Sequence, residues 1–234
     1  MMLFLKQTIR KTANKPSLFI VCDLLLFLYM YKIFQTQGII INEEERGESD
    51  RVLTVFTENF GKIRLYARGS RKIKSKLAGR LALFNHANIY FIRGKKREII
   101  TDAYILNNFV NTRQNLDRIK IAFYVGNLID NLVVASECDK KLWTAISWIF
   151  ENIERGVIYN ENNVFLRLFE IKTLEYLGYL PDFSKNNPFD FNPRILQILR
   201  IISSQPRRTG RLALTEVDLR GLKSATGLML NMIY

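Results

Sequence analysis

The residue types best suited to chemistry in this chain are cations that follow one another without an intervening anion. Eight Lys and Arg residues and no Asp or Glu lie between Lys62 and Arg80, both included. Cationic side chains neutralise phosphates and release the counterions condensed around nucleic acid. A loop that is basic only for solubility is expected to intersperse charges of both signs. The block therefore predicts contact with the backbone of a nucleic acid.

The beginning of the block has the alternation of a half-buried β-strand. From Gly61 to Arg68, every second side chain is Lys, Arg or Tyr, and those between them are apolar. Successive side chains of a strand point to opposite faces, so one face is predicted to be basic and the other to face a core. Tyr66 lies on the basic face and is predicted to stack on a base.

A second cationic cluster, 93–97, lies in a predicted hairpin turn that begins at Arg93-Gly94. It adds to the same expectation. The predicted nucleic-acid-binding residues are Lys62, Arg64, Tyr66, Arg68, Arg71, Lys72, Lys74, Lys76, Arg80, Arg93, Lys95, Lys96 and Arg97.

Patterns typical of catalysis or metal binding are missing from the sequence. One histidine, His86, and two isolated cysteines, Cys22 and Cys138, offer no imidazole pair, zinc finger or disulfide framework. Phosphate-binding glycine loops and nucleophile elbows are also missing. His86 lies in an alternating apolar run and is interpreted as structural. We therefore predict a protein that is not an enzyme and that binds no metal and no other cofactor.

The composition predicts a globular protein with a polyanionic partner. The chain has 234 residues, 48% hydrophobic and 24% charged, with a net charge of +13. That surplus favours nucleic acid or anionic membrane as the partner. Residues 31–100 hold fifteen basic and seven acidic side chains, a net of +8, whereas 101–183 hold eight and eleven, a net of −3. Binding is therefore expected in the first of these regions.

The hydrophobic pattern divides the chain into a β part and a helical part. Runs rich in β-branched and aromatic residues predict five strands, at 38–41, 52–57, 61–68, 81–92 and 97–106. Beyond 111 the apolar spacing becomes helical, and Thr215 with Asp218 forms a capping box for the last helix. Five short strands suit an OB-type barrel. The predicted fold class is α+β, with an N-terminal five-stranded OB-type β-barrel at 30–108 and an all-helical domain at 111–234.

The first 29 residues raise a separate question. Basic residues precede an apolar stretch at 18–34, in the order typical of a signal peptide or membrane anchor. Asp23 interrupts the stretch, and a carboxylate at the centre of a membrane helix costs about 2.5–3.5 kcal/mol. We interpret 1–29 as an apolar extension outside the native protein, with Met30 as the start. A membrane anchor and an additional core helix are the alternatives.

Three stretches resemble one known family. They are G-x-x-x-x-x-E-x-x-G-E-S-D-R-x-x-x-x-F-T-x-x-x-G-K at 38–62, A-R-G-S-R-K-x-K-S at 67–75, and F-L-R-L-F-E-I-K-T-L-E-Y-L-G-Y-L-P-D at 165–182. Together they resemble the RecO family of bacterial recombination mediators. The resemblance implies an OB fold followed by a helical domain. Many family members carry a four-cysteine zinc module after the third stretch, but 184–192 contain no Cys, so no zinc is expected.

The resemblance also implies a function, namely a cytoplasmic recombination mediator in DNA repair. Such a protein binds and anneals single-stranded DNA and helps to load recombinase onto coated strands. The implied partners are single-stranded DNA, a RecR-type mediator protein and the acidic tail of single-strand-binding protein. The alternative is a membrane-anchored basic protein whose β domain binds anionic lipid or nucleic acid. A nucleic-acid-processing enzyme is a weaker alternative, because the sequence lacks an acid–base or metal constellation.

Overall fold

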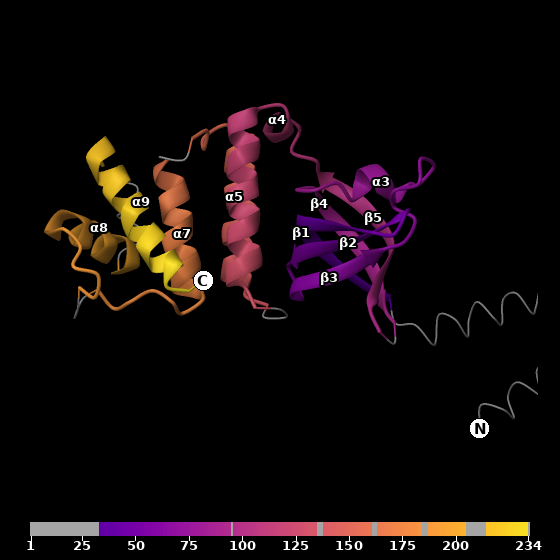
Figure 1. Ribbon diagram of the computed structural model, residues 1–234, viewed down its shortest axis with the longest axis horizontal. Helices are drawn as coiled ribbons and strands as arrows, with labels where there is room; N and C mark the ends of the chain where they lie inside the picture. Colours follow the sequence, from indigo (N-terminus) through magenta and orange to yellow (C-terminus); the bar gives the residue numbers. More distant parts are fainter. Residues whose placement is uncertain are drawn as a thin grey trace, which may run out of the picture.

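The computed structural model describes residues 33–94, 96–134, 138–160, 163–183, 187–204 and 214–233. The predicted extension 1–29, the proposed start at Met30 and the predicted site residue Lys95 lie outside these ranges. A barrel of strands forms one end of the described part and a group of helices forms the other. The helix α5 (Leu116–Leu132) lies between them (Figure 1).

The barrel is closed by five strands: β1 (Ile33–Arg46), β2 (Asp50–Thr57), β3 (Gly61–Ala67), β4 (His86–Arg93) and β5 (Glu98–Asn107). Their order around the barrel is β1-β2-β3-β5-β4, with β3 and β5 parallel and the other neighbours antiparallel. The short helix α3 (Leu77–Arg80) lies between β3 and β4 in the chain. A barrel of five strands is the architecture of the OB fold. The predicted fold class is therefore confirmed.

The strand boundaries differ most from the prediction in β1, which extends beyond 38–41 at both ends, and at the start of β4. β1 begins at Ile33, because its first residues pair with β4. The strand predicted at 81–92 begins only at His86, because the residues before it form a turn in which Phe84 has φ 65°. Leu81 and Phe84 are nevertheless buried. An apolar run in the sequence indicates that its residues are buried, but it does not show whether they form a turn or a strand.

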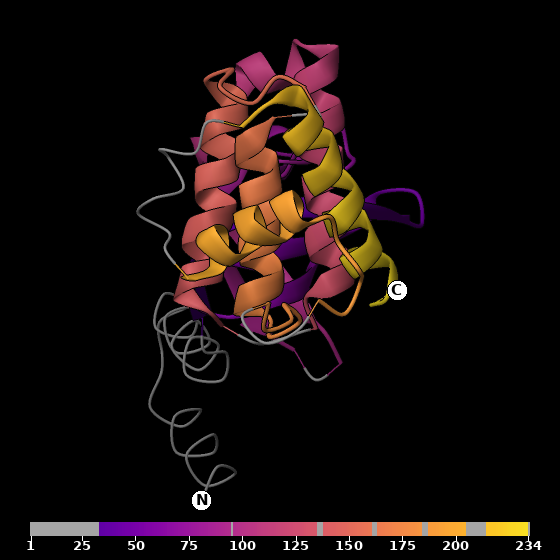
Figure 2. The ribbon, with the colours of Figure 1, turned by 90° about the vertical axis from the view of Figure 1, so that its left-hand side faces the viewer.

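The helices of the described part, besides α3 and α5, are α4 (Val110–Arg113), α6 (Lys140–Glu154), α7 (Val164–Tyr176), α8 (Pro193–Ser204) and α9 (Glu216–Asn231). α5, α6 and α7 follow Asn115, Asp139 and Asn163, whose side chains accept hydrogen bonds from backbone N–H groups of the first turn. The predicted capping box of Thr215 and Asp218 is present at α9. Seen from the helical end, α8 runs across the front of α7 (Figure 2). None of the described helices combines the length and the apolar composition needed to span a bilayer.

The barrel and the helices share a hydrophobic core. Ile39, Ile41, Phe56 and Phe84 of the barrel side belong to the same buried cluster as residues of α5 to α9, and a second cluster fills the barrel. α5 lies close to the backbone of β1 at Gly126. A Cβ atom there would lie 3.1 Å from the carbonyl oxygen of Ile41 and 3.2 Å from Cε1 of Phe84. The missing side chain lets the helix lie directly against the barrel.

Candidate nucleic-acid interface

The basic loop, residues 68–76, is anchored at its start by Asp50, the first residue of β2. The backbone N–H of Gly69 and the hydroxyl of Tyr66 each donate a hydrogen bond of 2.7 Å to the Asp50 carboxylate. The Gly69 N–H and then the Tyr66 hydroxyl lower the pKa of Asp50, because hydrogen bonds to a carboxylate favour its charged form. Gly69 has φ 61°, a conformation open to glycine without strain. The carboxylate thus fixes the point at which the chain leaves β3.

The next residue, Arg51, holds the loop further along. Its Nε donates to Ser70 Oγ and its Nη2 to the carbonyl oxygen of Ala78, both at 3.2 Å. Its Nη1 lies 2.9 Å from a carboxylate oxygen of Glu43, and Ser70 is fully buried. The sequence stretches G-E-S-D-R and A-R-G-S-R-K therefore hold each other in place. The loop is thus tied to the barrel near both of its ends.

Other side chains of the loop form a row of exposed cations. Arg68, Lys72, Lys74 and Lys76 are exposed, and none of them forms an ion pair with another described residue. The charge of the loop is thus directed to solvent. Its neutralisation by phosphates would release counterions from a nucleic acid.

Four more of the predicted cations, among them Arg71 of the loop itself, lie beside carboxylates. The pairs are Arg64–Glu44 at 2.6 Å, Arg71–Glu45 at 3.1 Å, Arg80–Asp102 at 2.9 Å and Arg93–Glu98 at 2.9 Å. Exposed pairs of this kind are worth little energy, so a phosphate can compete for the cation. The neighbouring carboxylate nevertheless repels that phosphate. Lys96 and Arg97 are exposed in the turn between β4 and β5.

Tyr66 is held between the loop and this turn. Its hydroxyl donates to Asp50, and the guanidinium carbon of Arg97 lies 4.5 Å from the centre of its ring. The hydrogen bond to Asp50 raises the pKa of the phenol, so the ring is neutral at physiological pH. The predicted stacking surface is therefore composite. A base that docks here would meet the guanidinium of Arg97, which lies over the half-buried Tyr66 ring.

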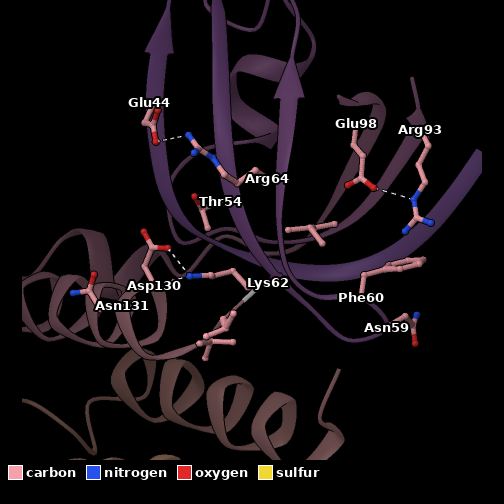
Figure 3. Close-up of a pocket in the computed structure, with 13 residues that line it drawn as sticks. Glu44, Thr54, Asn59, Phe60, Lys62, Arg64, Arg93, Glu98, Asp130 and Asn131 are labelled. Atoms are coloured by element: carbon pink, nitrogen blue, oxygen red, sulfur yellow. Dashed lines mark hydrogen bonds and ion pairs between the residues drawn. The ribbon is translucent and has the colours of Figure 1, made fainter. Parts of the chain in front are cut away.

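Lys62 has surroundings other than those predicted for it. Its Nζ donates to the backbone carbonyl oxygen of Asp130 and lies 3.3 Å from that residue's Oδ1, at the end of α5 (Figure 3). Asn42 of β1 donates to the other carboxylate oxygen at 2.9 Å. Only 15% of the Lys62 side chain is exposed. The expectation of an open basic face is therefore wrong at this position, because the helical part covers it.

A groove with a volume of about 830 Å³ lies between the β2–β3 face and the end of α5. Figure 3 shows that its cations face anions, in the pairs Lys62–Asp130, Arg64–Glu44 and Arg93–Glu98. Phe60 lies beside Arg93, whose guanidinium carbon is 5.6 Å from the ring centre. The charges inside the groove are thus balanced. The excess positive charge lies instead in the loop 68–76.

Sequence reasoning missed Asp50 and Arg51 as parts of the site, and it missed the pair Tyr90 and Tyr104, whose ring centroids are 5.9 Å apart. Two patterns could have found them. Asp50 and Arg51 lie in the G-E-S-D-R run that carries the family resemblance. The alternation of β4 places Tyr90 on the outer face, opposite the buried Ile89 and Phe91.

The arrangement of the histidine and the carboxylates in the described ranges bears on metal binding. No group of three or more His, Cys, Asp and Glu side chains there is arranged to hold a metal ion. The ring of His86 lies edge-on to Trp143 with centroids 5.7 Å apart, and burial lowers the pKa of His86. His86 thus lies at the contact between barrel and helices, in agreement with a structural role.

The fold and the site together define a class: an OB-fold protein with an anchored cationic loop and a helical part joined to its barrel. Two family models match the chain, Recombination protein O N terminal over residues 30–109 and Recombination protein O C terminal over residues 113–188. The chain belongs to the RecO family.

Curated relatives named DNA repair protein RecO are similar to this chain. That of Roseiflexus sp. (strain RS-1) is 33% identical over 150 residues, which are 64% of this chain and 52% of the relative. That of Syntrophomonas wolfei subsp. wolfei (strain DSM 2245B / Goettingen) is 30% identical over 147 residues, 63% of this chain and 58% of the relative. The chain thus spans about half the length of these relatives.

Proposed function

We propose that this chain binds single-stranded DNA through the loop 68–76 and acts as a recombination mediator in DNA repair. The observation that carries the proposal is the row of exposed cations in that loop, which Asp50 and Arg51 anchor to the barrel. Because the loop is held before binding, little conformational freedom is lost when a strand docks. Cations that follow a nucleic-acid backbone bind without strong sequence preference.

Membership of the RecO family supports the remaining parts of the proposal. These are annealing of complementary strands, help in loading recombinase onto coated strands, and a RecR-type protein as partner, all in the cytoplasm and without a catalytic step. Annealing brings two polyanions together, so a protein that promotes it must neutralise phosphates. Arg68, Lys72, Lys74 and Lys76 of the loop form no ion pair with another described residue, which suits the loop to that task.

We further infer that the acidic tail of single-strand-binding protein docks in a groove between α6 and α7. The groove has a volume of about 510 Å³. Its apolar lining includes Trp148, Leu168, Phe169 and Tyr176, and its basic lining is Lys140, Lys141 and Lys172. An apolar cavity edged by lysines is complementary to an acidic peptide that ends in an apolar side chain. Trp148 is 39% exposed, so an incoming side chain can contact its ring.

Replacement of Lys72, Lys74 and Lys76 together with Ala tests the loop. The plot of log binding constant against log salt concentration should become less steep by about 2, since each lost contact with a single strand changes the slope by about 0.7. Affinity should fall for every sequence tried, because phosphates are common to all sequences. Fluorescence anisotropy of a labelled oligothymidylate over a series of salt concentrations measures both quantities.

A matched control removes the same charge from the helical part. Lys120, Arg155 and Arg220 are exposed there, and their joint replacement with Ala should leave the slope unchanged. The loop is supported as the site if both triple variants are folded and the salt dependence of binding is less steep for the loop variant than for the control. Equal slopes would mean that binding follows net charge alone, and the proposal would then be abandoned.

A further inference from the structure

The outer face of β4 and β5 carries a pair of aromatic rings, a half-buried Tyr90 and an exposed Tyr104. The rings of Tyr90 and Tyr104 meet edge to face, with centroids 5.9 Å apart. The guanidinium carbon of Arg80 lies 5.2 Å from the centre of the Tyr104 ring, and its Nη1 lies 2.9 Å from Asp102. Tyr104 is 51% exposed and belongs to neither hydrophobic cluster. Its ring is therefore available to a ligand.

The register of the strands places amide side chains beside these rings. Gln37 of β1 is opposite Asn88 of β4, which is opposite Tyr104 of β5. In the neighbouring row, Gln35 is opposite Tyr90. Asn88 Nδ2 lies 3.4 Å from the Tyr90 hydroxyl, and both glutamines are exposed. These five residues form what we call the aromatic face.

The chemistry of the aromatic face suits bases better than phosphates. Its amides and phenols carry no net charge, and the nearby charges of Arg80 and Asp102 neutralise each other. Amide groups donate to and accept from the edges of bases, and an exposed aromatic ring stacks on any base. A single strand bound here would turn its bases toward the barrel.

We propose that the aromatic face contacts the bases of the same single strand whose phosphates the loop binds, an inference that rests on the proposed function of the loop. Lys76 directly precedes α3 and Arg80 ends it, so the last loop cation and Arg80 are separated by about one helical turn, roughly 6 Å along the axis. α3 lies beside β5 (Figure 1). A strand can thus pass from the loop to Tyr104 while remaining in contact with the protein.

Packing accounts for only part of this arrangement. Arg80 also donates to the carbonyl oxygen of Ala103 at 3.1 Å, so Arg80 and Asp102 fasten α3 to β5. That role explains neither the exposed ring of Tyr104 nor the amides around it. The packing role and the base-contact role predict different results when Tyr104 is replaced.

Tyr104→Ala should weaken binding of a fluorescein-labelled oligothymidylate by about 5- to 150-fold, the range found when a stacked base loses its aromatic partner. The salt dependence should keep its slope, because no phosphate contact is removed. Tyr104→Trp, which keeps a stacking ring, should restore most of the affinity. The control Tyr159→Ala removes a tyrosine of similar exposure, 59%, from the helical part and should leave binding unchanged.

A folded Tyr104→Ala variant with normal affinity overturns the inference. A reduced slope overturns it too, because Tyr104 would then act only by holding Arg80. The Lys72, Lys74 and Lys76 variant separates the two proposals: if it binds normally the loop fails, and if only Tyr104→Ala binds normally the aromatic face alone fails. Photo-crosslinking of an iodouracil-containing strand needs no variant. Crosslinks at Tyr90 or Tyr104 support the inference, and crosslinks confined to other residues contradict it.

Discussion

Replacing Gly126 with Val should loosen the contact between α5 and the barrel. A Cβ atom at this position would lie 3.1 Å from the carbonyl oxygen of Ile41 and 3.2 Å from Cε1 of Phe84. The first contact is backbone in a strand, and the second belongs to a ring that is 1% exposed. Because protein interiors are close-packed, neither can yield without shifting its surroundings. The two methyl groups of Val extend the clash further.

The expected cost is that of overpacking a core, about 1–3 kcal/mol. For a chain of this size each kcal/mol lowers the melting temperature by about 2–4 °C, so the total shift should be roughly 2–12 °C. Gly227 of α9 provides the control, since nothing lies within 4 Å of its built Cβ. Both glycines are inside helices, so the change in helix propensity on replacement with Val is shared and cancels.

Urea unfolding of the two Val variants, followed by tryptophan fluorescence and far-UV circular dichroism, measures the difference. The ring of Trp143 stacks on Phe56 of the barrel with centroids 6.3 Å apart, so its fluorescence reports on the contact itself. Equal unfolding free energies for Gly126→Val and Gly227→Val would refute the argument that the close approach of α5 needs glycine.

Two further predictions concern single sites. Lys62→Met should lower the free energy of unfolding by about 1.5–3 kcal/mol, because Asp130 loses a charged hydrogen-bond partner. The slope of log binding constant against log salt concentration, measured by anisotropy titration with a single strand, should be the same for this variant as for the unchanged protein. A slope less steep by about 0.7 would mean that Lys62 contacts a phosphate after all. An acidic peptide that ends in an apolar residue should change the fluorescence of Trp148 on titration. Reversing the charges of Lys140 and Lys141 to Glu should abolish that change, and an unaltered titration would place the peptide elsewhere.

The elements of this protein could be predicted from short stretches of sequence. Alternation in the run Gly61–Ala67 identified a strand with one buried face, and Leu65 and Ala67 are fully buried. The capping box of Thr215 and Asp218 needed only residues three apart. Such patterns work because side-chain direction and end capping depend on neighbours in the chain. The same limitation explains the misplaced start of β4, where the apolar run before His86 is buried as a turn.

The cationic block was evident from the sequence alone, but the availability of each cation was decided by the tertiary structure. Lys62 and Lys74 are the same residue type in one block. Lys62 meets Asp130, 68 residues away, and is covered, whereas Lys74 extends from an exposed loop. Asp50 anchors that loop through Gly69, 19 residues away. Charge pairing acts through space, so only the fold decides which cation keeps its charge free for a ligand.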